Sequence, residues 1–342
     1  MNILSLYGLF LAKTLTLVVS ISAIAIIITN LTKRNNAPTG KLKLTRLDES
    51  YTEIQNNMCL AKMTSAQKKI WKKEFNKKKQ KEEKINKKQN RLQQNLKIHK
   101  PTLYVLDFQG SLDAREVSSL RKEISAVLSV AKKGDEVLLR LESPGGLVHG
   151  YGLAAFQLQR LRNQSIPLTI SVDKIATSGG YMMASVASHI IAAPFSLIGS
   201  IGVVAQIPNF NRLLKRNEID IELHTAGKYK RTLTLFGENS EEGREKFRDD
   251  LNQTYLLFKQ FVGEMRPKLN IETVSTGAHW YGSQALEQGL IDEIGTSDDF
   301  IINKMATHQI LSVCYIRHQK VIDRLINKFS YSVKNLLKFL II

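Results

Sequence analysis

The sequence predicts an α/β fold with a mostly parallel sheet, preceded by a transmembrane helix and a basic helical stalk. Three observations carry this prediction. Short apolar runs alternate with segments of helical periodicity between residues 101 and 310, a long uncharged run lies near the amino terminus, and basic residues crowd the stretch between them. Such alternation is typical of a parallel sheet that helices cover on both sides. The chain is 43% apolar over 342 residues, so a wholly disordered protein is excluded.

The amino-terminal segment, residues 1–32, is expected to be a transmembrane anchor. Its only charge is Lys13, and residues 14–32 form an uncharged run of 19 residues, which is long enough to cross a bilayer. A cleaved signal peptide is the alternative, but no basic segment precedes the apolar stretch and the stretch is longer than usual. Basic residues follow the anchor directly, so the charge bias places the rest of the chain in the cytoplasm. Membrane lipid is therefore one expected partner.

The next segment, residues 33–100, is expected to be a basic linker that is helical over much of its length. Residues 30–100 hold 20 of the 49 basic side chains and 6 of the 31 acidic ones, whereas residues 101–342 are nearly neutral. From residue 67 to 100 the chain has no glycine or proline and many helix formers. The linker is either a solvated spacer or a polybasic segment that lies on anionic lipid. Because the positive charge is concentrated there, nucleic acid is not an expected partner.

The main domain is expected to span residues 101–310 and to begin with alternating strands and helices. Strands are predicted at 103–110, 136–142 and 167–172, and helices at 115–130 and 148–162.

Further elements are predicted after the segment ATSGGYMMAS. HIIAAP and SLIGSIGVV read as strands, NFNRLLKRN as a helix, IDIELHT as another strand, and residues 240–268 as a long polar helix.

Residues 175–211 contain no Asp, Glu, Lys or Arg and so resemble a second membrane span. Several glycines, Pro194 and His189 interrupt the run, however, so no unbroken apolar helix of about 20 residues fits inside it. Buried strands and a buried helix are the favoured interpretation, and membrane insertion is the alternative.

The last segment, residues 311–342, is expected to form a strand and an amphipathic helix. From residue 320 onward apolar residues recur at helical spacing, with Lys and Arg between them. Such a face packs on its own domain, on a neighbouring subunit or on lipid.

Neither a metal nor a cofactor is expected. Cys59 and Cys314 lie far apart in the sequence, without a CxxC motif or a Cys/His cluster, so neither a zinc site nor a disulfide is indicated.

Two glycine-bearing junctions are the candidate catalytic centre. One is the SPGG motif at 143–146 and the other is the ATSGG motif at 176–180, and each follows a predicted strand and precedes a predicted helix. Ligands of open parallel sheets bind at such positions, where free backbone N–H groups converge. Ser178 would present its hydroxyl there, with the N–H of Gly179 directed at developing negative charge. The alternative is that Ser178 is only a helix N-cap.

The first junction would supply the second oxyanion donor. Gly145 and Gly146 have no Cβ, so their backbone can approach a substrate closely.

The two junctions, the stretch IGSIGV, the segment TAGKYKR and the late WYGSQALEQGLIDEIG together resemble the membrane-anchored serine peptidases of the signal peptide peptidase A family, closest to the SohB branch. The resemblance covers about residues 102–300. It implies a crotonase/ClpP-like fold, hydrolysis of peptide bonds by a Ser/Lys dyad, assembly into a homo-oligomer, and a place at the cell inner membrane. It implies peptide substrates, which we expect to be hydrophobic or membrane-derived. The relatives work on the outer face, in conflict with the charge bias, so the side of the membrane stays open.

By the same resemblance, Ser178 is the nucleophile and Lys230, in the segment Gly227-Lys228-Tyr229-Lys230, is the base. Lys228 is the competing lysine. A lysine with the ordinary pKa of about 10.4 is protonated near neutrality, so a lysine base requires burial to lower its pKa.

Three alternatives remain open. A histidine could serve as the base, and the candidates are His189, His149 and His224, although none has a motif around it. An acyl-CoA enzyme of the crotonase fold would also use two backbone donors. The third is a catalytically inactive membrane scaffold. Trp280 and Tyr281 are assigned mainly a packing role.

Overall fold

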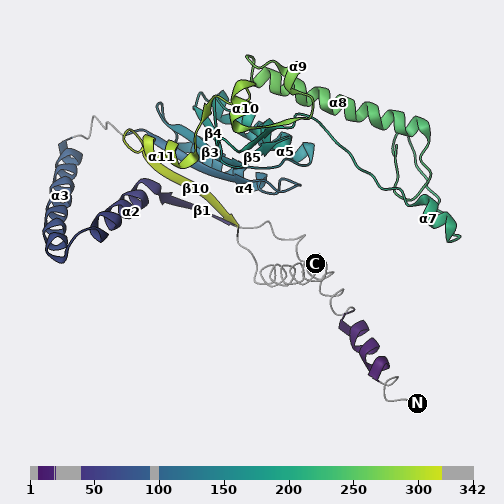
Figure 1. Ribbon diagram of the computed structural model, residues 1–342, viewed down its shortest axis with the longest axis horizontal. Helices are drawn as coiled ribbons and strands as arrows, with labels where there is room; N and C mark the ends of the chain where they lie inside the picture. Colours follow the sequence, from purple (N-terminus) through teal and green to yellow (C-terminus); the bar gives the residue numbers. More distant parts are fainter. Residues whose placement is uncertain (1–6, 19, 21–39, 93–99, 318–342) are drawn as a thin grey trace. The chain divides into compact units, whose positions relative to one another are not determined.

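The computed structural model describes residues 7–18, 20, 40–92 and 100–317 (Figure 1). Residues 42–315 form one compact unit, and residues 1–41 together with 316–342 form another. The candidate site and the elements that position it lie in the first unit.

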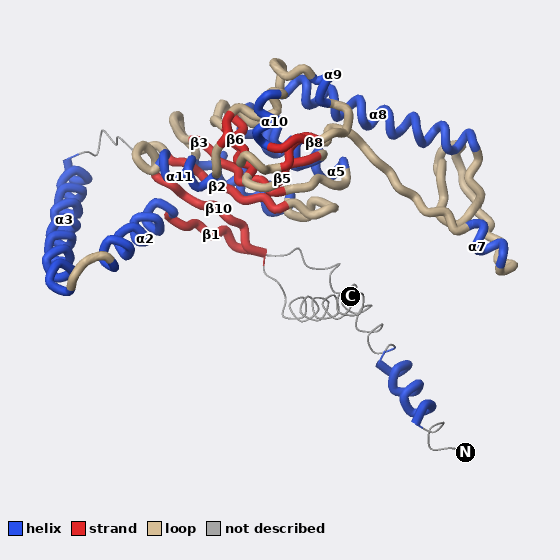
Figure 2. Tube along the Cα trace, viewed as in Figure 1, coloured by secondary structure: helices blue, strands red, loops and turns tan. Residues whose placement is uncertain are grey.

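A seven-stranded sheet is the centre of the domain (Figure 2). Its strands, in spatial order, are β1 (Gly40–Arg46), β10 (Gln309–Arg317), β2 (Thr102–Gln109), β3 (Glu136–Glu142), β4 (Leu168–Val172), β6 (His189–Ala192) and β9 (Glu293–Ile294). Each pair from β10 to β9 is parallel. The predicted α/β class with a mostly parallel sheet is therefore confirmed, and the three strands expected first along the domain are β2, β3 and β4.

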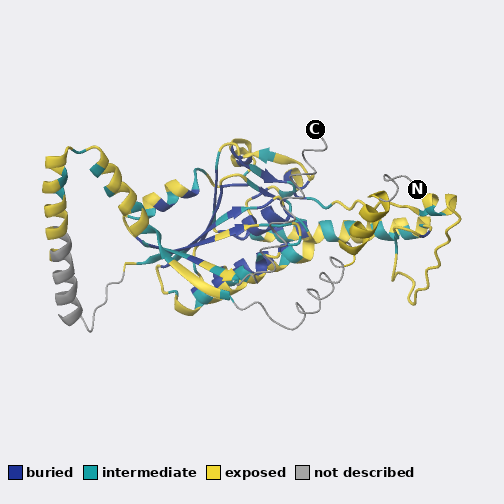
Figure 3. Ribbon diagram, turned by 90° about the horizontal axis from the view of Figure 1, so that it is seen from below, coloured by how far each residue is buried: buried dark blue, intermediate teal, exposed yellow. Residues whose placement is uncertain are grey.

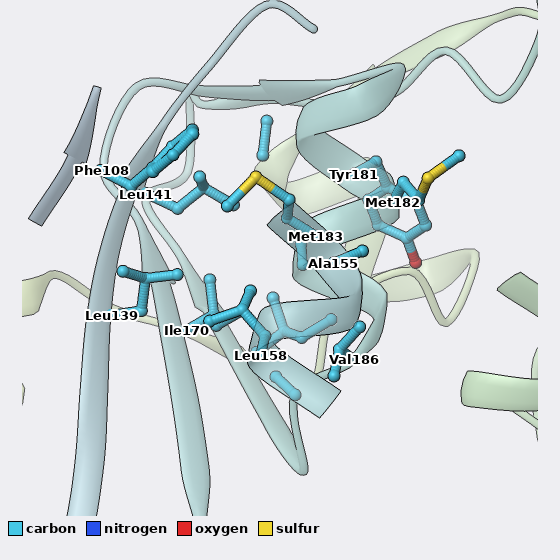
Figure 4. Close-up of a cluster of buried hydrophobic side chains, with 14 of the residues drawn as sticks. Phe108, Leu139, Leu141, Ala155, Leu158, Ile170, Tyr181, Met182, Met183 and Val186 are labelled. Carbon is cyan, nitrogen blue, oxygen red and sulfur yellow. The ribbon is translucent and has the colours of Figure 1, made fainter. Parts of the chain in front are cut away.

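The sheet is covered on both faces, which explains why its strands are apolar throughout. The larger core joins residues such as Leu139 and Ile170 to α4 (Val117–Val130), α5 (Val148–Asn163) and α6 (Gly179–Ser185). Figure 4 shows part of this core, where Met183 of α6 lies near Leu141 of β3 and the side chains of α5.

The opposite face carries a smaller core. Val105 and Leu138 of the sheet meet Ile301 of α11 (Ser297–Lys304) there.

The strands of a second, three-stranded sheet are interleaved with those of the first along the chain. This sheet consists of β5 (Ile175–Thr177), β7 (Leu197–Gly199) and β8 (His279–Tyr281), and β8 pairs antiparallel to β7. All residues of α6 are buried, as are most of β5 and β6. Up to residue 201 the apolar run is therefore mostly interior strand and helix, as the favoured interpretation expected, although Pro194 and Phe195 between β6 and β7 are exposed.

Residues 203–240, called the arm here, leave the core after β7 and are largely exposed (Figure 3). The expected helix is present as α7 (Asn211–Arg216). The strand expected at 219–225 is wrong, because no strand is found there. A strand requires a partner for its backbone groups, and the alternating Ile219 and Ile221 are half exposed rather than packed on a sheet.

The predicted long helix is α8 (Glu241–Met265). The side chain of Ser240 caps its start by accepting the N–H of Gly243 at 3.1 Å. Only the carboxyl-terminal half packs on the domain, through Phe258 and Val262, and it lies against α6. Two short helices, α9 (Ile271–Val274) and α10 (Gly282–Glu287), complete the domain.

The structure differs from the expected linker at 33–100 in the first part of that segment. Most of its described part is helical, as α2 (Leu47–Ala61) and α3 (Ser65–Leu92), but β1 is a strand at the edge of the main sheet. Tyr51 of α2 packs against the smaller core, and its hydroxyl donates to Asp298 at 2.9 Å. The linker therefore starts within the domain, and only α3 has the character of a stalk.

The two expected terminal helices fall largely on residues outside the described part. Residues 7–18 and 20 of the expected anchor at 1–32 are helical, and the rest of it is not described. Among the described residues, no helix combines the length and apolar character that a bilayer crossing requires. The amphipathic helix expected from residue 320 lies outside the described residues. The strand expected in 311–342 is β10, an inner strand of the main sheet.

Candidate active site

Ser178 lies between β5 and α6 with a strained backbone. Its φ is 51° and its ψ is −120°, a conformation that costs about 1–3 kcal/mol for a residue other than glycine. Hydrogen bonds hold it there: the N–H of Ser178 donates to the carbonyl of Gly199 at 2.8 Å, and the carbonyl of Ser178 accepts from Met182 at 3.0 Å. The serine is fixed at the tip of a sharp turn from strand to helix.

The hydroxyl of Ser178 is free to react. The residue is half-buried, and no hydrogen-bond partner of its Oγ is found among the described residues. Residues after Ser178 form the first turn of α6, so their N–H groups face away from the helix. In the part of the chain that the structure describes, the N–H of Gly179 has no acceptor. Ser178 occupies the N-cap position of α6, but its side chain makes no capping hydrogen bond, so the alternative interpretation does not account for its hydroxyl.

The SPGG loop lies directly against this turn. Gly145 has a φ of +87°, and a Cβ added to it would lie 2.8 Å from the Cβ of Ser178 and 2.8 Å from the nitrogen of Gly179. Backbone bonds join the two junctions, with the N–H of Ser143 donating to Ile175 at 2.8 Å and that of Thr177 donating to Ser143 at 3.1 Å. The structure thus brings the two glycine-bearing junctions together.

The three expected oxyanion donors differ in availability. The N–H of Gly145 donates to the Oγ of Ser143 at 3.1 Å, so it is already engaged. The N–H groups of Gly146 and Gly179 have no acceptor within the described residues. Gly146 also has no room for a side chain, because a Cβ there would lie 2.0 Å from the carbonyl oxygen of Leu112. Gly146 and Gly179 are the donors that the geometry leaves free.

A buried pair of hydroxyls that sequence reasoning missed supports the SPGG loop. The Oγ of Ser143 and the phenol of Tyr151 lie 2.6 Å apart, and Tyr151 donates to the carbonyl of Ser111 at 2.9 Å. Burial raises the pKa of Tyr151, so it remains a neutral donor. Gly179 fits against the Tyr151 ring, where a Cβ would come within 2.4 Å of ring carbon. The only sequence signal was the serine of SPGG itself.

The expected base, Lys230, lies in the arm and is exposed. Its backbone N–H closes a turn on the carbonyl of Gly227 at 3.1 Å. The competitor Lys228 binds Glu242 at 2.7 Å, and this hydrogen bond, with a further one to Tyr229, raises the pKa of Lys228. Lys228 is thereby kept protonated and is unsuited to act as a base.

A single chain does not bring Ser178 and Lys230 together. Glu242, which holds the segment of Lys230 through Lys228, lies sixteen residues before Phe258 on α8. At 1.5 Å per residue that separation is about 24 Å. Phe258 belongs to the part of α8 that packs on the core with α6. Within one chain, Lys230 is therefore an exposed residue of the arm and is not buried beside Ser178.

None of the three candidate histidines lies where it could serve as the base in place of Lys230. His189 pairs in register with Thr169 at the amino ends of the strands, away from the site, and its Nε2 lies 2.9 Å from Glu293. His224 is exposed in the arm beside Glu222. His149 is exposed in the first turn of α5, close in sequence to the SPGG loop, but no bond orients it.

The two aromatic residues and the two cysteines singled out in the sequence contribute no group to the candidate site. The ring of Trp280 lies against Gly199, whose added Cβ would be 2.8 Å from it, so Trp280 packs as expected. Tyr281 is half exposed and contacts Phe195. Both cysteines are free, and the described residues contain no group of three His, Cys, Asp or Glu side chains placed to hold a metal ion.

Known proteins are similar to this chain along nearly its whole length. Residues 2–158 match the model of the peptidase family S49 N-terminal region, and residues 160–311 match that of peptidase family S49. The probable protease SohB of Buchnera aphidicola subsp. Schlechtendalia chinensis is 57% identical over 301 residues, which are 87% of this chain and 98% of the relative. The probable protease SohB of Haemophilus influenzae is 46% identical and covers 94% of this chain and 92% of its own.

Among solved structures, a mutant of the 1510-N membrane-bound stomatin-specific protease, in complex with a substrate peptide, is 14% identical. It covers 68% of this chain and 99% of its own, with a TM-score of 0.42.

The mostly parallel α/β domain and the relatives together define a peptidase. The chain belongs to peptidase family S49 and, through its SohB relatives, to the SohB branch of that family.

Proposed function

We propose that the chain is a serine endopeptidase in which Ser178 is the nucleophile and Lys230 is the base. The observation that carries this proposal is the conformation of Ser178, which holds an unbonded hydroxyl at a strained turn beside the free N–H groups of Gly146 and Gly179. Strain of this kind is retained at sites where a side chain must be held in place for a reaction.

The chemistry follows from these groups. The Oγ of Ser178 attacks the carbonyl carbon of the scissile peptide bond while the amine of Lys230 takes its proton. The N–H groups of Gly146 and Gly179 donate to the oxyanion that forms, and the lysine returns the proton to the leaving amine. Water then hydrolyses the acyl-enzyme by the same route.

The lysine is supplied by a second copy of the chain. Three facts support this: Lys230 is exposed, the arm that carries it extends along α8 away from the core, and the arm exposes large apolar side chains. Val204 is 92% exposed, Leu213 56% and Leu223 52%. Apolar surface of this extent is typical of an interface. In a homo-oligomer the arm of one chain would lie on the site of its neighbour and bury Lys230 there. Burial disfavours the charged ammonium and so favours the neutral amine that a lysine base requires.

The substrates are hydrophobic or membrane-derived peptides. Apolar side chains surround the SPGG loop, where Leu147 donates its N–H to the carbonyl of Leu112 at 2.8 Å. The Leu112 side chain is 72% exposed, and those of Leu147 and Val148 are almost half exposed. Burial of substrate side chains against these residues would favour apolar peptides.

The enzyme is anchored in the cell inner membrane by residues 1–32, on the sequence argument given above. An acyl-CoA enzyme is disfavoured because carboxylates close in sequence to the SPGG loop or bonded to its neighbours are engaged: Glu142 pairs with Lys174, Asp113 pairs with Arg115, and Glu116 accepts from Ser111.

Labelling with a fluorophosphonate tests the nucleophile. The wild-type full chain should be labelled and Ser178→Ala should not. Ser165→Ala is the matched control, because Ser165 is an exposed serine with a φ of 55°, and it should be labelled as the wild type is. An unlabelled wild type, or equal labelling of Ser178→Ala, would contradict the proposal.

A further inference from the structure

The helix α3 has a charge distribution that the peptidase reaction does not use. It contains 28 residues, about 42 Å of helix. Eleven of them are lysine and one is arginine, against three glutamates. No described side chain of α3 is buried. Such a helix is poorly stabilised by its own domain, since it packs no apolar face into the core.

An aromatic pair interrupts the lysines on one side of α3. The rings of Trp71 and Phe75 stack with their centroids 4.8 Å apart and an angle of 11° between their planes. Residues four apart share a face of a helix, so the two rings form one apolar patch. Lys68 and Lys72 each lie three residues before one of the rings, so lysines border the patch. Phe75 is 39% exposed, which leaves apolar surface open to a partner.

We propose that α3 lies on an anionic lipid surface, with Trp71 and Phe75 at the level of the headgroups. Aromatic rings bordered by lysines are typical of helices that lie in a membrane interface. Each lysine near an anionic surface strengthens binding by about fivefold. The excess of lysine over arginine fits a diffuse layer of lipid phosphates, whereas arginine is the residue of choice for the nucleic acid that would be the other polyanion.

This inference stands apart from the peptidase mechanism. It uses only α3, so a chain without nucleophilic activity would still show it, and failure of the lipid contact would leave the assignment of Ser178 untouched.

Tryptophan fluorescence tests the contact directly, because the chain has only two tryptophans, Trp71 and Trp280. The full chain is reconstituted into vesicles of phosphatidylcholine alone or mixed with phosphatidylglycerol, each containing brominated lipid as quencher. We expect strong quenching only with the anionic lipid, and its loss in Trp71→Phe, where Trp280 alone remains. High salt should reduce the quenching, since screening weakens the attraction.

Two pairs of adjacent exposed lysines provide a matched comparison. Replacing Lys72 and Lys73 by Gln should lower the fraction of quenched Trp71, whereas replacing Lys132 and Lys133, in the loop after α4, should leave it unchanged. Equal quenching in both lipids, or an equal loss in the two double variants, would overturn the proposal. So would a shift of the Trp71 emission by duplex DNA without any response to vesicles, which would assign the helix to nucleic acid.

Discussion

Ser178 keeps its strained conformation because its neighbours leave it no other. Gly145 and Gly179 have no side chains where the turn and the SPGG loop meet, and the bonds of Ser178 to Gly199 and Met182 fix both sides of its peptide. The strain energy of this conformation, about 1–3 kcal/mol, is offset by the hydrogen bonds that hold the two junctions together. If Ser178 is the nucleophile, as proposed, its hydroxyl is held in place before any substrate arrives, which reduces the entropy lost on reaching the transition state.

Ser178→Ala should abolish peptide cleavage, by at least about 10³-fold, without unfolding the domain. The side chain makes no bond that the fold requires, so the free energy of unfolding should change by less than about 1 kcal/mol. Cleavage of a fluorogenic hydrophobic peptide and thermal unfolding measure the two quantities. Retained cleavage in this variant would assign the nucleophile to another residue.

The two lysines of the arm should respond differently. Lys230→Ala should reduce cleavage about as far as Ser178→Ala. When two residues act as one catalytic unit, removing either costs nearly as much of the rate as removing both. Lys228→Ala removes an exposed ion pair with Glu242 and should change the rate by less than about threefold. Steady-state rates of the two variants decide between the lysines. Full activity in Lys230→Ala with loss in a histidine variant such as His149→Ala would replace the Ser/Lys mechanism.

Gly145→Ala should disturb the site more than the fold. The Cβ would lie 2.8 Å from that of Ser178 and force the serine or the loop to move; a displacement of about 1 Å can cost about 10²-fold in rate. Gly277→Ala is the matched control, because its φ of +82° carries the same backbone penalty and nothing lies within 4 Å of its added Cβ. Both variants should lose stability in thermal unfolding, Gly145→Ala more so because of its clash, and only Gly145→Ala should lose activity.

The sequence was sufficient to predict that Ser178 and the SPGG loop lie together, because both short motifs follow strands of one parallel sheet. It could not reveal the contact of Ser143 with Tyr151, since a buried pair of hydroxyls leaves no periodic signal. The bond from Gly145 to Ser143 was equally hidden, because it depends on the conformation of the loop.

At the scale of elements, the parallel strands were predictable because their apolar runs are continuous. Two elements were mispredicted for a common reason, which is that strands depend on partners remote in the sequence. The segment of β1 reads GKLKLTR and has the composition of the linker, yet it joins the sheet beside β10. The residues 219–225 alternate as a strand does but have no strand beside them.

The end of α8 is fastened by a charged cluster whose contribution should depend on pH. Burial opposes the ionisation of Asp292, but both terminal nitrogens of Arg266 at 2.8 Å and the N–H of Ile190 at 2.7 Å outweigh it and hold the pKa of Asp292 below its usual value. A lowered carboxyl pKa stabilises the fold fully above the ordinary value of about 3.9, and this stabilisation is lost as the pH falls through the lower folded value.

Asp292→Asn should therefore cost about 1–3 kcal/mol of unfolding free energy at pH 7. The difference in unfolding free energy between Asp292→Asn and the wild type should become smaller as the pH falls from 5 toward 2. Urea unfolding at several pH values measures it. Asp249→Asn serves as a control because Asp249 is exposed on α8 and its carboxylate has no hydrogen bond or ion pair among the described residues. A loss of stability in Asp292→Asn that is constant with pH would contradict the ionic account.

At the scale of the whole molecule, charge and apolar surface are separated along the chain. Lysines concentrate in α3, whereas the arm exposes apolar residues around Lys230 and the SPGG loop exposes others around Ser178. One copy of the chain thus keeps Ser178, the proposed nucleophile, apart from Lys230, the proposed base. The apolar arm of one copy and the apolar border of the Ser178 site of the next copy are two different surfaces, as a head-to-tail interface requires. Interfaces of that kind close into rings when the rotation between subunits permits.

Mixing two inactive variants tests this arrangement. Ser178→Ala and Lys230→Ala should each be inactive alone, but subunits of the two exchanged at equal amounts should recover about one quarter of the wild-type activity, because a site is complete only where an intact serine meets an intact lysine from the next chain. Leu213→Asp, on the exposed side of α7, should weaken assembly and lower activity in parallel, since burial of a charge at an interface is costly. Light scattering follows the assembly, and energy transfer between labelled chains verifies that the variants exchange. If exchanged mixtures stay inactive, or if monomers cleave peptides at the full rate, the dyad is not completed by a second copy.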